Sequence, residues 1–144
     1  LKTARLRHRT IHRMLSPPFD YTLLMPGQIR FGWGARRHVG SLAATLGRRV
    51  FLLSGSRALT ERGVIAGLVD DLGRAGLPVI TAQAASGEPV VGDVDHLTQT
   101  WRDAGAGPGD CVLAVGGGST IDLGKAVAAL MPQPARRSVR DYLE

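Results

Sequence analysis

The stretch from Asp110 to Leu130, DCVLAVGGGSTIDLGKAVAAL, constrains the fold of this chain more than any other. An apolar run over Cys111 to Val115 predicts a buried strand, and Gly116 to Gly118 separate that strand from a helical pattern. Because glycine has no Cβ, the backbone can turn sharply there and a ligand can approach it closely. A helix that begins after Ser119 would direct its free N–H groups and the positive end of its dipole toward that ligand. The stretch therefore predicts a strand, a turn and a helix that together bind a phosphate group.

Two better-known glycine motifs do not match this turn. A P-loop has four residues between its glycine and the Gly-Lys pair, whereas five separate Gly118 from Gly124, and Ala126 stands where Ser or Thr is required. A GxGxxG fingerprint that begins at Gly116 would place its third glycine at Ile121. Both motifs are therefore excluded, and the remaining alternative to a phosphate site is a tight turn without a ligand.

The polar residues at the start of this helix have an expected structural role. Ser119 and Asp122 stand three residues apart, which is the spacing of a capping box. Asp122 and Lys125 have a spacing that also allows a pair across one helical turn. We expect Asp122 to cap backbone N–H groups and Lys125 to act structurally.

The string GGGSTIDLGK, residues 116–125, resembles the GGGSxxDxxK signature of the iron-containing alcohol dehydrogenase family. Residues 19–35 resemble the opening β-hairpin of that family, residues 48–63 resemble its first parallel strand and the following turn, and residues 138–144 resemble the loop after the glycine motif. The resemblance covers about residues 19–144 and implies an α/β fold. We expect a Rossmann-like parallel sheet with flanking helices and an N-terminal β-hairpin.

The family resemblance also implies a reaction, the transfer of a hydride between an alcohol or aldehyde and NAD(P). Family members carry Fe(2+) or another divalent metal on an aspartate and three histidines of a second, helical domain, which this sequence lacks. No catalytic residue and no metal ligand can therefore be assigned, and we expect the chain alone to bind dinucleotide weakly and to be inactive. Glycerol dehydrogenases and dehydroquinate synthases share the architecture but often have Lys in place of Ser119. A non-catalytic nucleotide-binding remnant is the third interpretation.

Three loops are expected to contact the cofactor, because the carboxyl ends of parallel strands lie along one edge of a sheet. Residues 116–119 would bind the pyrophosphate, residues 54–57 would face the adenosine ribose, and residues 87–91 would border the adenine or the ribose. The resemblance adds Asp122 to the cofactor site. The candidate residues are Gly55, Ser56, Arg57, Gly116, Gly117, Gly118, Ser119 and Asp122.

The ribose loop favours NADP over NAD. An acidic side chain after the first strand normally binds the ribose hydroxyls and repels a 2′-phosphate, and the loop SGSR has none. Gly55 leaves room, Ser56 can donate a hydrogen bond, and Arg57 can pair with a phosphate. In the alternative interpretation Arg57 points into water and the pocket accepts either cofactor.

Alternating strand and helix patterns predict one α/β domain over residues 17–144. The family resemblance implies that this domain binds a dinucleotide and is truncated at its C-terminal end. After Met131, prolines and arginines predict an exposed loop. Strands are expected at residues 50–53, 78–82 and 111–115, and helices at 35–46, 58–75, 94–104 and 120–130.

The net charge of +6 does not indicate nucleic-acid binding, because its distribution is uneven. Residues 1–16 carry five basic residues and no acid, while residues 17–144 carry thirteen basic and twelve acidic residues. We expect the basic head to be a disordered tail, with a mitochondrial transit peptide as the alternative.

The remaining features predict a cytoplasmic protein that does not enter a membrane. No apolar run approaches the roughly 20 residues that cross a bilayer. Cys111 is the single cysteine, and its place in an apolar strand predicts a small buried hydrophobe. The strand edges of the opening hairpin favour a homodimer through that hairpin.

Overall fold

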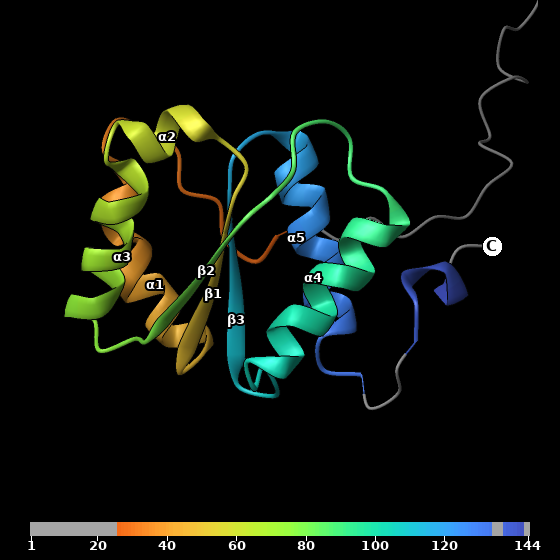
Figure 1. The fold of residues 1–144 in the computed structure, drawn as a ribbon. Coiled ribbons are helices and arrows are strands. Elements are labelled where there is room, and N and C mark those ends of the chain that lie inside the picture. Colours follow the sequence, from red (N-terminus) through yellow and green to blue (C-terminus); the bar gives the residue numbers. More distant parts are fainter. Residues whose placement is uncertain (1–25, 134–136, 143–144) are drawn as a thin grey trace, which may run out of the picture. The chain divides into compact units, whose positions relative to one another are not determined.

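A computed structural model describes residues 26–133 and 137–142 and contains one three-stranded parallel sheet in the order β2-β1-β3 (Figure 1). The strands are β1 (Arg49–Ser54), β2 (Val79–Gln83) and β3 (Asp110–Val115). Residues 50–53 of the central strand are completely buried, which fits a strand covered on both faces. Phe51 pairs with Ile80 on one side and with Val112 on the other. The expected Rossmann-like parallel sheet is confirmed.

Helices cover both faces of this sheet, as Figure 1 shows. Val50 and Leu52 of β1 pack in a core with α1 and α3, whereas Phe51 and Leu53 pack in a second core with α4 and α5. In the second core the rings of Phe51 and Trp101 lie 5.2 Å apart between centroids. The helices are α1 (Val39–Leu46), α2 (Arg57–Glu61), α3 (Val64–Arg74), α4 (Val91–Asp103) and α5 (Gly118–Leu130), with the short 3-10 helices η1 (Ala35–His38) and η2 (Val139–Tyr142).

One expected helix, over residues 58–75, is wrong as a single element. Gly63 adopts φ 72°, a left-handed conformation that interrupts the helical hydrogen bonds and separates α2 from α3. Gly76, with φ 78°, follows the end of α3 as expected. The loop predicted after Met131 lies partly outside the described residues, and the basic head at residues 1–16 lies wholly outside them.

The expected N-terminal β-hairpin is not found in residues 26–34, which contain no strand. The side chains of Ile29, Phe31 and Trp33 alternate as in a strand but are 71%, 101% and 103% exposed. A strand is stable only when a neighbouring strand takes its backbone hydrogen bonds and its apolar side chains are packed. Residues 19–25, the first half of the expected hairpin, lie outside the described residues.

An ion pair joins the amino ends of β1 and β3. The Asp110 carboxylate is shielded from solvent and accepts hydrogen bonds from Arg49 Nη2 at 2.6 Å, Arg49 Nε at 3.2 Å and the Gly107 N–H at 3.0 Å. The Arg49 guanidinium holds the pKa of Asp110 below its usual value. Next to it, burial raises the pKa of the half-buried Cys111 thiol, which packs in the core with α1 and α3.

Candidate functional site

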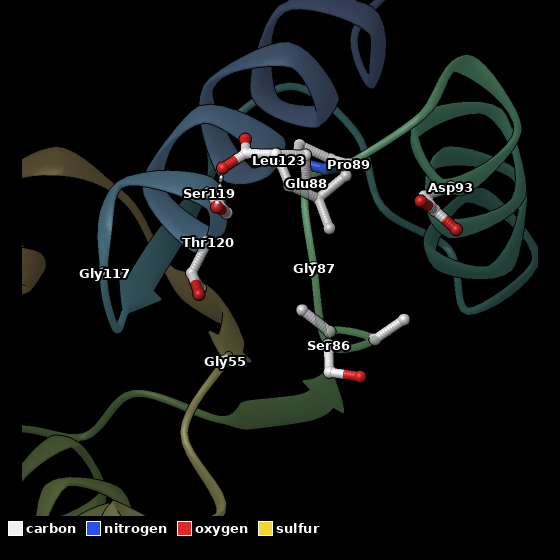
Figure 2. A pocket seen from close by; sticks show the side chains of 12 residues that line it. Gly55, Ser86, Gly87, Glu88, Pro89, Asp93, Gly117, Ser119, Thr120 and Leu123 are labelled. Atoms are coloured by element: carbon white, nitrogen blue, oxygen red, sulfur yellow. Dashed lines mark hydrogen bonds between the residues drawn. The ribbon is translucent and has the colours of Figure 1, made fainter.

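Backbone hydrogen bonds continue the pairing of the three strands at their carboxyl ends. The Gly55 N–H donates to the Val115 carbonyl at 3.1 Å, and the Ala84 N–H donates to the Ser54 carbonyl at 2.8 Å. The three following loops therefore start side by side, and a cavity of about 450 Å³ opens among them (Figure 2). It is lined by Gly55, Ala84, Ala85, Ser86, Gly87, Glu88, Pro89, Asp93, Gly117, Ser119, Thr120 and Leu123.

The start of α5 forms one wall of this cavity. Gly117 is the N-cap residue, and no side chain hydrogen-bonds to this helix end. The N–H groups of residues 118–120 have no carbonyl acceptor within the helix, because the first turn lacks partners four residues earlier. Together with the helix dipole, these free donors favour an anion in the cavity.

The capping box expected from Ser119 and Asp122 is wrong, because α5 begins two residues earlier than predicted. Ser119 is the second helical residue, and its hydroxyl donates to Glu88 Oε1 at 3.0 Å. Asp122 accepts instead from Lys125 Nζ at 3.0 Å, as the alternative spacing argument allowed. Both partners are largely exposed, so this pair contributes less than about 1 kcal/mol.

The three glycines of the turn have different reasons to lack a side chain, and none of them adopts a positive φ. A Cβ on Gly116 would lie 2.9 Å from Thr120 Cβ, so Gly116 is required by packing. A Cβ on Gly117 or Gly118 would meet no heavy atom within 4 Å. Neither the backbone conformation nor the packing requires glycine at positions 117 and 118. The absence of side chains there leaves open space beside the free N–H donors of α5.

Gly55 does not provide the room for a ribose that its sequence position suggested. A Cβ on Gly55 would lie 2.8 Å from Thr120 Cβ, so the side chain of Thr120 occupies that space. Thr120 is buried and contacts glycines at the ends of two different strands, Gly55 and Gly116. Sequence reasoning missed this role, because nothing local in the chain shows that both loops face the same threonine.

The other two residues of the ribose loop lie outside the cavity lining. Ser56 caps α2, since its Oγ accepts from the Leu59 N–H at 3.3 Å. Arg57 is exposed, and no side-chain hydrogen bond or ion pair involves it within residues 26–133 and 137–142. Of the eight predicted residues, Gly55, Gly117 and Ser119 line the cavity, whereas Gly116, Gly118, Ser56, Arg57 and Asp122 do not.

The charged side chains that line the cavity are acidic. Glu88 accepts from Ser119, and Asp93 Oδ2 accepts from the Val90 N–H at 2.9 Å, which caps α4. Over residues 26–133 and 137–142, no Lys, Arg or His lines the cavity. An anion bound here would therefore rely on backbone N–H groups and the helix dipole.

The described part of the chain contains neither a cluster of metal ligands nor a helix that could span a membrane. No group of three or more His, Cys, Asp and Glu side chains within it could hold a metal ion. Its helices are all too short or too polar to cross a membrane.

Comparisons with known proteins identify the fold and the family. A sequence model of iron-containing alcohol dehydrogenases matches residues 26–144. The probable alcohol dehydrogenase EutG of Escherichia coli is 31% identical over 113 residues, which are 78% of this chain and 28% of that protein. Choline dehydrogenase of Bacillus subtilis is 29% identical over 122 residues, which are 85% of this chain and 29% of that protein.

The fold agrees with solved structures of the same kind. NADH-dependent butanol dehydrogenase A from Thermotoga maritima superposes with a TM-score of 0.71 at 27% identity, over 85% of this chain and 30% of that one. The chain spans less than a third of the length of each of these relatives. On the match over residues 26–144, the chain belongs to the iron-containing alcohol dehydrogenase family.

Proposed function

We propose that residues 17–144 form the dinucleotide-binding domain of a metal-dependent alcohol dehydrogenase, and that the start of α5 binds the pyrophosphate of NAD(P). The observation that carries this proposal is the open space at Gly117 and Gly118, beside donors that no side chain caps. A cavity of about 450 Å³ is within the range of small-molecule sites. The volume of the cavity and the free N–H groups beside it support the proposal of a dinucleotide site.

The described residues would bind and orient this cofactor. The N–H groups of residues 118–120 would donate to the phosphate oxygens, and the loop of residues 84–89 would border the adenosine. When bound, the nicotinamide supplies the hydride acceptor or donor that interconverts an alcohol and an aldehyde. The metal of the family has no ligand set among the described residues, and no role in this chain is assigned to it.

The proposed substrate is a small alcohol or aldehyde, in line with relatives named for choline and butanol. An enzyme of the glycerol dehydrogenase or dehydroquinate synthase kind is the alternative within the same architecture. Ser119, where those enzymes often have Lys, favours the alcohol dehydrogenase. The exposed alternating side chains of Ile29, Phe31 and Trp33 favour a homodimer formed through this segment.

Our proposal for the cofactor is NADP, with Arg57 as the partner of the 2′-phosphate. The loop after β1 carries no acidic side chain, and the exposed Arg57 guanidinium is available to a ligand. The alternative is NAD, which is supported by the similarity to the NADH-dependent butanol dehydrogenase A from Thermotoga maritima. The two assignments differ in the charge that the loop must accept.

We expect NADPH to bind about fivefold more tightly than NADH, since an exposed ion pair contributes about 1 kcal/mol at most. The Arg57→Ala substitution should remove that difference by weakening NADPH alone. Both dissociation constants can be measured from the fluorescence of the reduced nicotinamide. If NADH binds tenfold more tightly than NADPH, the assignment to NADP is wrong.

A further inference from the structure

The carboxylate of Glu88 contacts the same helix end that the proposed function assigns to the pyrophosphate. Ser119 Oγ donates to Glu88 Oε1 at 3.0 Å, and these two cavity-lining residues are 31 positions apart in the sequence. Figure 2 shows this hydrogen bond as a dashed line between the β2–α4 loop and the first turn of α5. Gly87, with φ 107°, precedes Glu88, and Pro89 follows it.

The negative charge of the Glu88 carboxylate opposes the binding of a diphosphate at this helix end. The Ser119 hydroxyl has a single hydrogen, so while it donates to Glu88 it cannot donate to a phosphate oxygen. A carboxylate near the helix N-terminus is itself stabilised by the dipole and by the free N–H groups. Because the described residues that line the cavity include no cationic side chain, none of them offsets the repulsion between Glu88 and a bound diphosphate.

The Glu88 side chain can nevertheless move away from Ser119 and the start of α5. Its side chain is exposed, and its one hydrogen bond within the described residues is the one to Ser119. No heavy atom lies within 4 Å of a Cβ built on Gly87, so the neighbouring backbone has room. An arriving anion therefore has to displace an exposed hydrogen bond and does not meet a fixed barrier.

We propose that Glu88 is an internal competitor for the diphosphate site, which lowers the affinity for the cofactor and accelerates its release. This inference rests on the proposed function, since it requires the diphosphate to bind at the start of α5. When the ligand leaves, the Glu88 carboxylate returns to Ser119. Substitution at Glu88 changes the affinity for any ligand that carries the diphosphate, whether or not a 2′-phosphate is present.

The test compares ADP with adenosine by isothermal titration calorimetry on the full chain. Glu88→Gln preserves the size of the side chain and an oxygen that accepts from Ser119, but removes the negative charge. Asp70→Asn is the matched control, because Asp70 is an exposed acid on α3, which packs on the opposite face of the sheet. We expect Glu88→Gln to bind ADP about fivefold to tenfold more tightly, as for the loss of one partly screened like charge, with adenosine unaffected. Asp70→Asn should match the original chain for both ligands.

Each other outcome of this titration overturns the proposed competition between Glu88 and the diphosphate. Weaker ADP binding by Glu88→Gln would mean that the carboxylate assists the ligand, for instance by accepting from ribose hydroxyls, and would overturn the competition. An unchanged affinity would overturn it as well, while the proposed function would stand. If neither the original chain nor Glu88→Gln binds ADP, the proposed function fails and this inference fails with it.

Discussion

Replacing Gly117 by valine is expected to abolish diphosphate binding and to leave the fold intact. The backbone of Gly117 has φ −80° and ψ −173°, an extended conformation that valine adopts readily, and a Cβ there meets no heavy atom within 4 Å. The new side chain would fill the space where phosphate oxygens reach the N–H groups of α5. The loss of two such hydrogen bonds, about 1.5–3 kcal/mol each, weakens ADP binding at least about a hundredfold. Calorimetric titration with ADP and a melting curve measure the two effects.

Gly124→Ala is the matched control for this substitution. A Cβ on Gly124 would lie 2.7 Å from Ala114 Cβ, so it pushes α5 away from β3 without entering the cavity. We expect this variant to melt at a lower temperature than the original chain. Gly117→Val should melt closer to the original chain than Gly124→Ala does, because the poorer N-cap preference of valine is offset in part by the reduced entropy of the unfolded chain. Equal destabilisation by both variants would mean that Gly117 serves the fold and not a ligand.

The Asp110→Asn substitution is expected to lower the free energy of unfolding by about 1–2 kcal/mol at neutral pH, because it removes charge-assisted hydrogen bonds to Arg49. Asparagine keeps the shape of the side chain, but its amide nitrogen is itself a donor and cannot accept from Arg49 or from the Gly107 N–H. Urea unfolding of both proteins at about pH 7 measures the difference. Asp70→Asn, which removes the same charge at an exposed site, should change the free energy of unfolding much less.

The effect of Asp110→Asn should depend on pH in a defined direction. The ion pair holds the pKa of Asp110 below its unfolded value, so the folded chain binds fewer protons than the unfolded chain as the pH falls. The contribution of Asp110 is therefore complete above about pH 5 and is lost as the pH falls toward the lowered pKa. At about pH 3 the difference between the two proteins should be smaller than at neutral pH. A constant difference across this range would show that the carboxylate charge is not the cause.

The strands and most helices could be predicted because their signals are local. The apolar run of residues 50–53 and the strand before Gly116 are in the structure within one residue of their expected ends. The break between α2 and α3 was missed, since the apolar pattern over residues 58–75 does not show that Gly63 takes a left-handed conformation. The start of α5 was misplaced, because Ser119 has the sequence of a cap while its hydroxyl is used by Glu88.

The candidate site could be predicted only in part, because its composition depends on contacts between loops. The glycines at positions 117 and 118 were recognised from one short motif. Thr120, which fills the space beside Gly55, depends on two strand ends that lie far apart in the sequence. Glu88 fell within a loop that was expected near the ribose, but its contact with α5 could not be predicted. The acidic character of the cavity follows from that packing and is not visible in the nearly neutral composition of residues 17–144.

The most direct test of the central claim is to follow the backbone amide signals of the isotope-labelled chain by NMR while ADP is added. The account predicts that the largest shifts fall on residues 117–120, with smaller shifts in the loop of residues 84–89 that lines the same cavity. Saturating ADP that leaves residues 117–120 unperturbed in a folded sample, or that shifts a different part of the chain, would contradict it.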